Sequence, residues 1–164
     1  MLGAGNWVKL RWHGFGRPGP AVLEPRLIMR AAAIDLGTVR VGRAIADELN
    51  LMAHPRPHLD GRNPGRLVEE LRRWAEEEGI DTFLVGLPRT LDGREGPMAK
   101  RARRFAEILR TRTGRTVELV DERWSTKEAH VLLRAQGLDE RRARSRIDSA
   151  SAAVLLQSWL DARS

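Results

Sequence analysis

Four acidic residues stand where predicted strands end or a predicted helix begins. Asp35 ends a short apolar run, Asp121 and Glu122 follow a second one, and Asp148 opens a segment with helical spacing. A carboxylate turned toward a sheet is costly unless a cation pairs with it. Several carboxylates without Cys or His partners suit Mg²⁺ or Mn²⁺, and two such ions support phosphodiester cleavage. These acids therefore predict metal-dependent hydrolysis of nucleic acid.

Each acid also has a purely structural interpretation. Asp148 would serve as a helix-capping residue, and Asp35 would belong to the turn at Gly37. Asp121 and Glu122 would form surface ion pairs with Arg123. Their joint placement favours a site, because the carboxyl ends of neighbouring parallel strands lie together at one edge of a sheet.

Composition narrows the class of protein. The chain has 164 residues, 41% of them hydrophobic, which is enough for one core and too short for two ordinary domains. Its 29 Lys and Arg exceed 22 Asp and Glu and leave a charge of +7, which favours nucleic acid as the partner. The absence of cysteine excludes thiolate chemistry and fits a cytoplasmic protein. No apolar run reaches the roughly 18 residues of a membrane span, so no membrane partner is expected.

Two segments differ in their patterning. In residues 1–28, Gly, Pro and Arg interrupt every apolar run, which predicts a disordered basic tail without regular elements. Met29 stands one residue before the first strand-like run, so an alternative interpretation is that the tail is an extension upstream of the true start. Residues 29–162 are predicted to form a single domain.

Within that domain, short apolar runs alternate with amphipathic segments. Closely spaced strands predict an antiparallel meander at 31–36, 41–46 and 51–59. Strands at 82–86 and 116–120 are separated by helices, which requires crossover connections and parallel pairing. Helical spacing and Gly or Pro boundaries predict helices at 64–78, 97–113, 125–136 and 147–160, with a loop at 141–146.

Four motifs occur in order along this domain: Ile34-Asp35-Leu36-Gly37-Thr38; Val85-Gly86-Leu87-Pro88 with Asp92-Gly93 and Glu95-Gly96-Pro97; Asp121-Glu122-Arg123 with Ser125-Thr126; and Ile147-Asp148-Ser149-Ala150 with Leu155-Leu156-Gln157-Ser158. Together they resemble the YqgF/RuvX family over about residues 30–162. The resemblance implies an α/β, RNase-H-like fold with a five-stranded mixed sheet of order 3-2-1-4-5 flanked by helices. It also implies a Mg²⁺- or Mn²⁺-dependent nuclease.

The resemblance assigns roles to individual residues. Asp35, Glu122 and Asp148 become the metal ligands and catalytic acids, with Asp121 as a supporting acid. Strand alternation does not separate Asp121 from Glu122, because Glu122 can lie beyond the strand end. The expected substrate-binding cations are Arg89, Arg123, Arg141, Arg142, Arg144 and Arg146.

Two positions depart from the family pattern. Thr90 stands where Asn is frequent, which would weaken a phosphate or loop contact. Arg43 stands where the family has an apolar residue, which implies an exposed sheet face or a cation that faces the substrate.

Several functions remain open at this stage. The resemblance implies maturation of the 5′ end of pre-16S rRNA, or resolution of Holliday junctions, for which two symmetric cuts favour a homodimer. A non-catalytic RNA-binding module is a third alternative. The Asp-x-Gly-Thr turn also begins two-lobed ATPases, but this chain has room for only one lobe.

Overall fold

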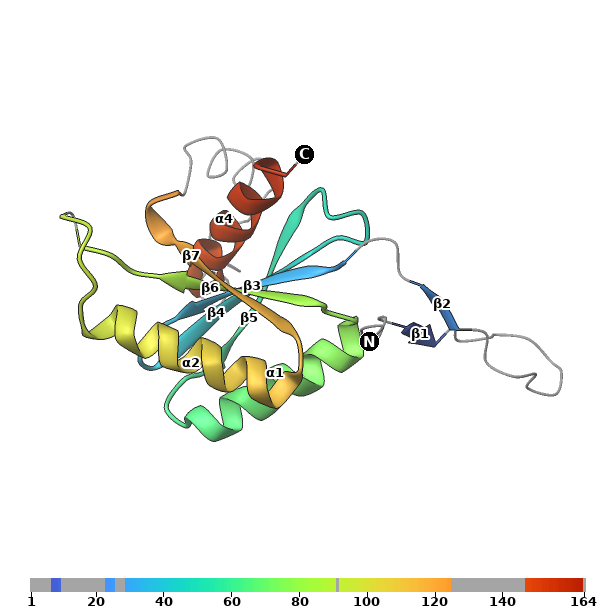
Figure 1. Ribbon diagram of the computed structural model, residues 1–164, viewed down its shortest axis with the longest axis horizontal. Coiled ribbons are helices and arrows are strands. Elements are labelled where there is room, and N and C mark those ends of the chain that lie inside the picture. Colours follow the sequence, from blue (N-terminus) through green and yellow to red (C-terminus); the bar gives the residue numbers. More distant parts are fainter. Residues whose placement is uncertain (1–6, 10–22, 26–28, 91, 125–146, 164) are drawn as a thin grey trace, which may run out of the picture.

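The computed structural model describes residues 7–9, 23–25, 29–90, 92–124 and 147–163. Its main element is a five-stranded mixed sheet with strand order β5-β4-β3-β6-β7 (Figure 1). Counted within the domain this is order 3-2-1-4-5, so the predicted fold class is confirmed. Helices α1 and α2 cover one face of the sheet, and α4 covers the other.

The first three strands of this sheet form an antiparallel meander. They are β3 (Ala31–Leu36), β4 (Arg40–Ala46) and β5 (Ala53–Asp60). β5 lies at the edge of the sheet and contains Pro55 and Pro57, which have no N–H to donate and are tolerated only at such a position. The pairing of β4 with β5 shifts register between Val41 and Arg43.

The remaining strands are parallel because a helix precedes each one. α1 (Pro64–Glu78) leads to β6 (Thr82–Leu87), and α2 (Pro97–Thr113) leads to β7 (Thr116–Asp121). Both helices have the predicted bounds, since each begins with Pro and ends before a glycine in the left-handed region. A short 3₁₀ turn, η1 (Glu122–Trp124), follows β7, and α4 (Ile147–Asp161) is the last element.

Side-chain alternation along β3 divides the core into two layers. Ala32 and Ile34 pack with the apolar stripes of α1 and α2, whereas Ala31 and Ala33 pack with α4. The small alanines allow α4 to lie close to the sheet. Asp35 follows the alternation of Ala31 and Ala33, so it belongs to the α4 face.

Part of the predicted secondary structure lies outside the described residues, namely the helix at 125–136 and the loop at 141–146. In the N-terminal segment, β1 (Trp7–Lys9) and β2 (Leu23–Pro25) pair antiparallel at positions where the sequence predicted no strand. The interpretation of 1–28 as a tail or start-site extension stays a prediction. No helix in the described part of the chain is long and apolar enough to cross a membrane.

Candidate functional site

Asp35 lies between two glycines at the carboxyl end of β3. Gly42 of β4 is its partner in register. On the other side, Ile34 pairs with Val85, so Asp35 and Gly86 come next along their strands. Neither glycine has a side chain, so neither neighbouring strand contributes a Cβ atom beside the Asp35 carboxylate on the α4 face of the sheet.

The Glu122 side chain extends over Gly86. A Cβ atom added at residue 86 would lie 2.7 Å from Glu122 Oε1, so only glycine accommodates the carboxylate in this position. Although the residue as a whole is exposed, desolvation of its carboxyl group raises the pKa of Glu122, and the negative charges of Asp35 and Asp121 raise it further. Asp35 and Glu122 therefore approach each other across the backbone of Gly86.

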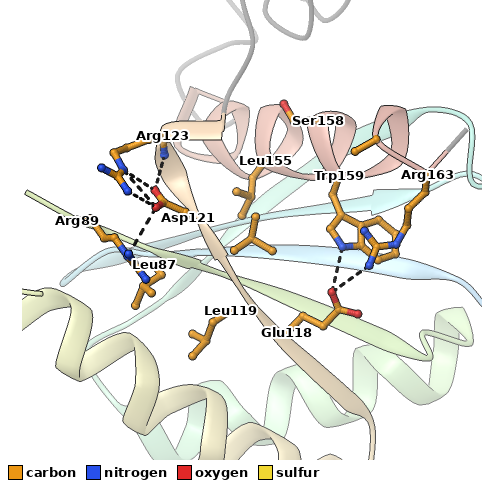
Figure 2. A pocket seen from close by; sticks show the side chains of 12 residues that line it. Leu87, Arg89, Glu118, Leu119, Asp121, Arg123, Leu155, Ser158, Trp159 and Arg163 are labelled. Atoms are coloured by element: carbon orange, nitrogen blue, oxygen red, sulfur yellow. Dashed lines mark hydrogen bonds and ion pairs between the residues drawn. The ribbon is translucent and has the colours of Figure 1, made fainter. Parts of the chain in front are cut away.

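Asp121 belongs to a different set of contacts. Its position in register with Leu87 places it on the α2 face of the sheet. Arg123 Nη2 lies 2.7 Å from Asp121 Oδ2, and Arg89 Nε lies 3.6 Å from the same oxygen (Figure 2). The hydrogen bonds from Arg123 lower the pKa of Asp121 to about 2. The two acids that the sequence could not separate thus have different surroundings: Asp121 is paired with arginines, and Glu122 faces Asp35.

Asp148 enters through the first turn of α4. The Arg43 backbone N–H donates to the hydroxyl of buried Ser149 over 3.2 Å, and Arg43 pairs with Ile34. The beginning of α4 is thereby fixed above the strand ends that carry Asp35. The side chain of Asp148 lies outside the described residues, so its role as a ligand stays a prediction.

The donor set suits a hard divalent cation. Two carboxylates converge without His or Cys, and desolvation together with the negative charge of Asp35 raises the pKa of Glu122. Among the described side chains no group of three His, Asp or Glu is close enough to hold a metal ion. A third carboxylate would have to come from a side chain outside that set, as predicted for Asp148.

The predicted substrate cations fall into two groups. Arg89 and Arg123 flank Asp121, and Arg89 also lies 3.9 Å from Glu95, which pairs with Arg103 of α2. These contacts connect α2 to the end of β7 and fix the guanidinium groups beside the acids. The second group, Arg141, Arg142, Arg144 and Arg146, lies outside the described residues.

A groove of about 610 Å³ runs along β7, away from Arg89 and Arg123. At its other end, Arg163 lies over the Trp159 ring at 3.8 Å, and both residues bond to Glu118 (Figure 2). Trp159 is half-buried and packs against the core layer between α4 and the sheet.

Both interpretations of Arg43 were wrong. Arg43 projects from the α1 face, where its guanidinium lies 4.6 Å from the centre of the Trp74 ring and its Nε donates to Pro57 O. It is a half-buried structural cation beneath α1. Thr90 also keeps its loop together, because its hydroxyl donates to Asp92 and its backbone pairs with Arg94.

Sequence reasoning missed Gly42, Gly86 and Ser149. Gly86 was visible as a glycine ending an apolar run, but its purpose depends on a side chain 36 positions later. Ser149 was visible inside its motif, but its partner is a backbone N–H in another strand.

Known proteins match nearly the whole domain. Residues 29–162 match the family described as "RuvX: Holliday junction resolvase". A relative named "Putative pre-16S rRNA nuclease" from Anaeromyxobacter sp. (strain Fw109-5) is 44% identical over 135 residues, covering 82% of this chain and 98% of that protein. A relative of the same name from Chloroflexus aurantiacus is 36% identical and covers 80% and 86%.

Solved structures show the same fold at low identity. RuvC of T. thermophilus in complex with a Holliday junction substrate superposes with a TM-score of 0.60 at 17% identity, covering 83% of this chain and 96% of that one. The fowlpox virus resolvase, with Holliday junction DNA, gives a TM-score of 0.54 at 14% identity over 82% and 99%. These neighbours have the RNase-H-like fold of resolvases. With the nuclease relatives, they support a hydrolase that acts on phosphodiester bonds of nucleic acid, and the chain belongs to the RuvX (YqgF) family.

Proposed function

We propose that this chain cleaves structured RNA with Mg²⁺ or Mn²⁺ held by Asp35, Glu122 and Asp148, and that its substrate is the 5′ end of pre-16S rRNA. The names of the curated relatives support the substrate, since they match most of the chain at 36 to 44% identity. The resolvase-like fold supports dependence on a divalent metal.

The observation that carries the metal assignment is the position of Glu122 above Gly86. The glycine brings a second carboxylate to the side of Asp35, and desolvation together with the charge of Asp35 raises the pKa of Glu122. Like charges are brought together at a cost, which a bound cation offsets. Asp121 has its compensating charge in Arg123 and Arg89, so it is left out of the ligand set.

The residues around the acids position the substrate for cleavage. Gly42 adds no side chain beside Asp35, so a phosphodiester can approach Asp35 from the β4 side, while Glu122 lies over Gly86 on the other side. Arg89 and Arg123 bind phosphates of the nucleic-acid strand and hold that strand beside the acids. A metal ion bound to the three carboxylates would activate water and stabilise the leaving oxygen.

The test compares wild type with Asp35→Asn, Glu122→Gln and Asp148→Asn on a 5′-extended 16S rRNA precursor, with Mg²⁺ or Mn²⁺. Each substitution removes a charge while keeping the shape, and each is expected to lower cleavage by at least about 100-fold. Chelation of the metal should abolish cleavage by wild type. Variants that cut as well as wild type would show that the site assignment is wrong.

Resolution of four-way junctions is the second candidate, favoured by the description of the matching family. It requires two sites on opposing strands and therefore a two-fold dimer. A four-way DNA junction is assayed in parallel, and sedimentation measures the mass with and without it. Cleavage of the junction by a dimer, with the rRNA precursor uncut, would replace the proposed substrate. Binding without cleavage of either would identify an RNA-binding module.

A further inference from the structure

Three side chains with hydrogen-bond donors gather where β4 begins and β5 ends. Arg40, His58 and Arg62 line a shallow depression of about 280 Å³ together with Val39 and Asp60. Arg40 and Arg62 are exposed and His58 is half-buried. We refer to these five residues as the β4–β5 pocket.

This pocket opens on the same face of the sheet as Asp35. Leu59 packs into the core beneath α1, so its neighbours His58 and Asp60 project from the opposite, α4 face. Arg40 is paired in register with Asp60 and shares that face. Only β4 separates β5 from β3, and the pocket therefore lies beside the acidic site, on the side away from β7.

The backbone around the pocket is closely packed. Gly61 N donates to Val39 O over 2.8 Å, and a Cβ at residue 61 would lie 2.9 Å from Val41 Cγ2. Asp60 accepts hydrogen bonds from Arg62 Nε and Nη2 at 2.9 and 2.8 Å, which orients the guanidinium plane. Those bonds use one edge of the guanidinium, so Nη1 is turned away from that carboxylate.

Charge indicates what the pocket binds. Two guanidinium groups stand against one carboxylate, so the lining has a net positive charge, and the imidazole of His58 adds a further hydrogen-bonding group. Arg89 and Arg123 lie on the other side of the acids, at the end of β7. Cations thus flank Asp35 and Glu122 along the line of strand ends, an arrangement that fits successive phosphates of one strand.

We propose that the β4–β5 pocket binds a backbone phosphate of the nucleic-acid strand that is cut at the acidic site, on the side opposite Arg89 and Arg123. This inference rests on the proposed function, because it takes the acids as the point of cleavage. A phosphate contact fixes the register of the strand without reading its sequence.

Binding is measured in the Glu122→Gln protein, which keeps the 5′-extended rRNA fragment uncut. Adding Arg40→Gln or Arg62→Gln is expected to weaken binding on the order of tenfold, the effect of one charge-assisted hydrogen bond. The slope of log K against log salt should fall by about 0.7 to 0.9. Arg112→Gln, which removes an exposed arginine of α2 on the opposite face, is the matched control and should leave both quantities unchanged.

A neutral phosphate distinguishes direct contact from a general loss of charge. Single 2′-deoxynucleoside methylphosphonates are placed in turn around the cleavage point. At one position, the methylphosphonate should weaken binding to the protein that keeps Arg40. The same methylphosphonate should not weaken binding to the Arg40→Gln protein any further. Additive losses at every position, or unchanged affinity and salt slope in both arginine variants, would overturn the proposal. A failure of the proposed function is detected separately, because the Glu122→Gln protein would then still cleave the rRNA fragment.

Discussion

At the scale of single residues, the absence of a side chain at Gly86 decides where a carboxylate can lie. Glu122 Oε1 occupies space that a Cβ at residue 86 would need. The residue is not at a positive φ, so its glycine is required for proximity and not for backbone conformation. The site thus depends on a residue that contributes no functional group.

Gly86→Ala is expected to displace the Glu122 carboxylate and lower cleavage of the rRNA precursor by on the order of 100-fold, since displacements of about 1 Å have such effects. The matched control is Gly65→Ala in the first turn of α1, where the added Cβ would be 3.6 Å from Asn63 Oδ1, an ordinary contact. Steady-state cleavage and circular dichroism check both variants. Full activity in Gly86→Ala would contradict the assigned position of Glu122.

At the scale of elements, α4 is fixed to the sheet by two buried polar side chains. Ser149 accepts a hydrogen bond from the Arg43 N–H near the start of the helix. Gln157 accepts from the Ala53 N–H at 2.9 Å and donates to Leu51 O at 3.1 Å, two turns further along. The first contact lies beside the proposed site and the second at the far end of β5.

Because the two contacts lie at different distances from the proposed site, we expect both to affect stability and only one to affect activity. Ser149→Ala and Gln157→Leu each leave a backbone N–H beneath α4 without its partner, partly buried at Arg43 and buried at Ala53, which costs about 1 to 3 kcal/mol in the free energy of unfolding. Only Ser149→Ala is expected to lower cleavage as well, because it loosens the turn that carries Asp148. Urea unfolding and cleavage rates are measured on both proteins. Equal rates in the two variants would show that the Ser149 contact does not position the site.

Many of the helices and strands were predictable from the sequence. Proline and glycine punctuation with helical spacing predicted α1 and α2, and the apolar run that ends at Asp35 predicted β3. Arg43 was not predictable, because its partner Trp74 comes from a helix 31 positions later. The choice between Asp121 and Glu122 depended on whether the residues after β7 continue its alternation, and a local pattern does not contain that information.

At the scale of the whole molecule, metal binding and stability are linked. Without a cation the neighbouring carboxylates repel each other, so Asp35→Asn is expected to raise the Tm in a chelator. In wild type, Mg²⁺ or Mn²⁺ at about 100 times its Kd adds about 2.7 kcal/mol and raises the Tm by about 5 to 10 °C.

Asp35→Asn and Glu122→Gln should lose most of that metal-induced rise. Asp121→Asn should keep it, because Arg123 and Arg89 hold the Asp121 carboxylate away from the proposed ligands. Thermal unfolding with and without metal measures all four proteins. An Asp121→Asn protein that no longer responds to metal would move Asp121 into the ligand set.

The two edges of the five-stranded sheet also differ in whether they can pair with a strand of another molecule. The prolines of β5 interrupt one edge, whereas β7 carries an unbroken row of backbone N–H groups on the other. Two copies joined through β7 would use the proline-free edge of this five-stranded sheet in both molecules, and a third copy would meet only the proline-containing edge at β5 in that sheet. Intermolecular strand pairing in concentrated protein is therefore expected to stop at pairs of molecules instead of growing into fibres.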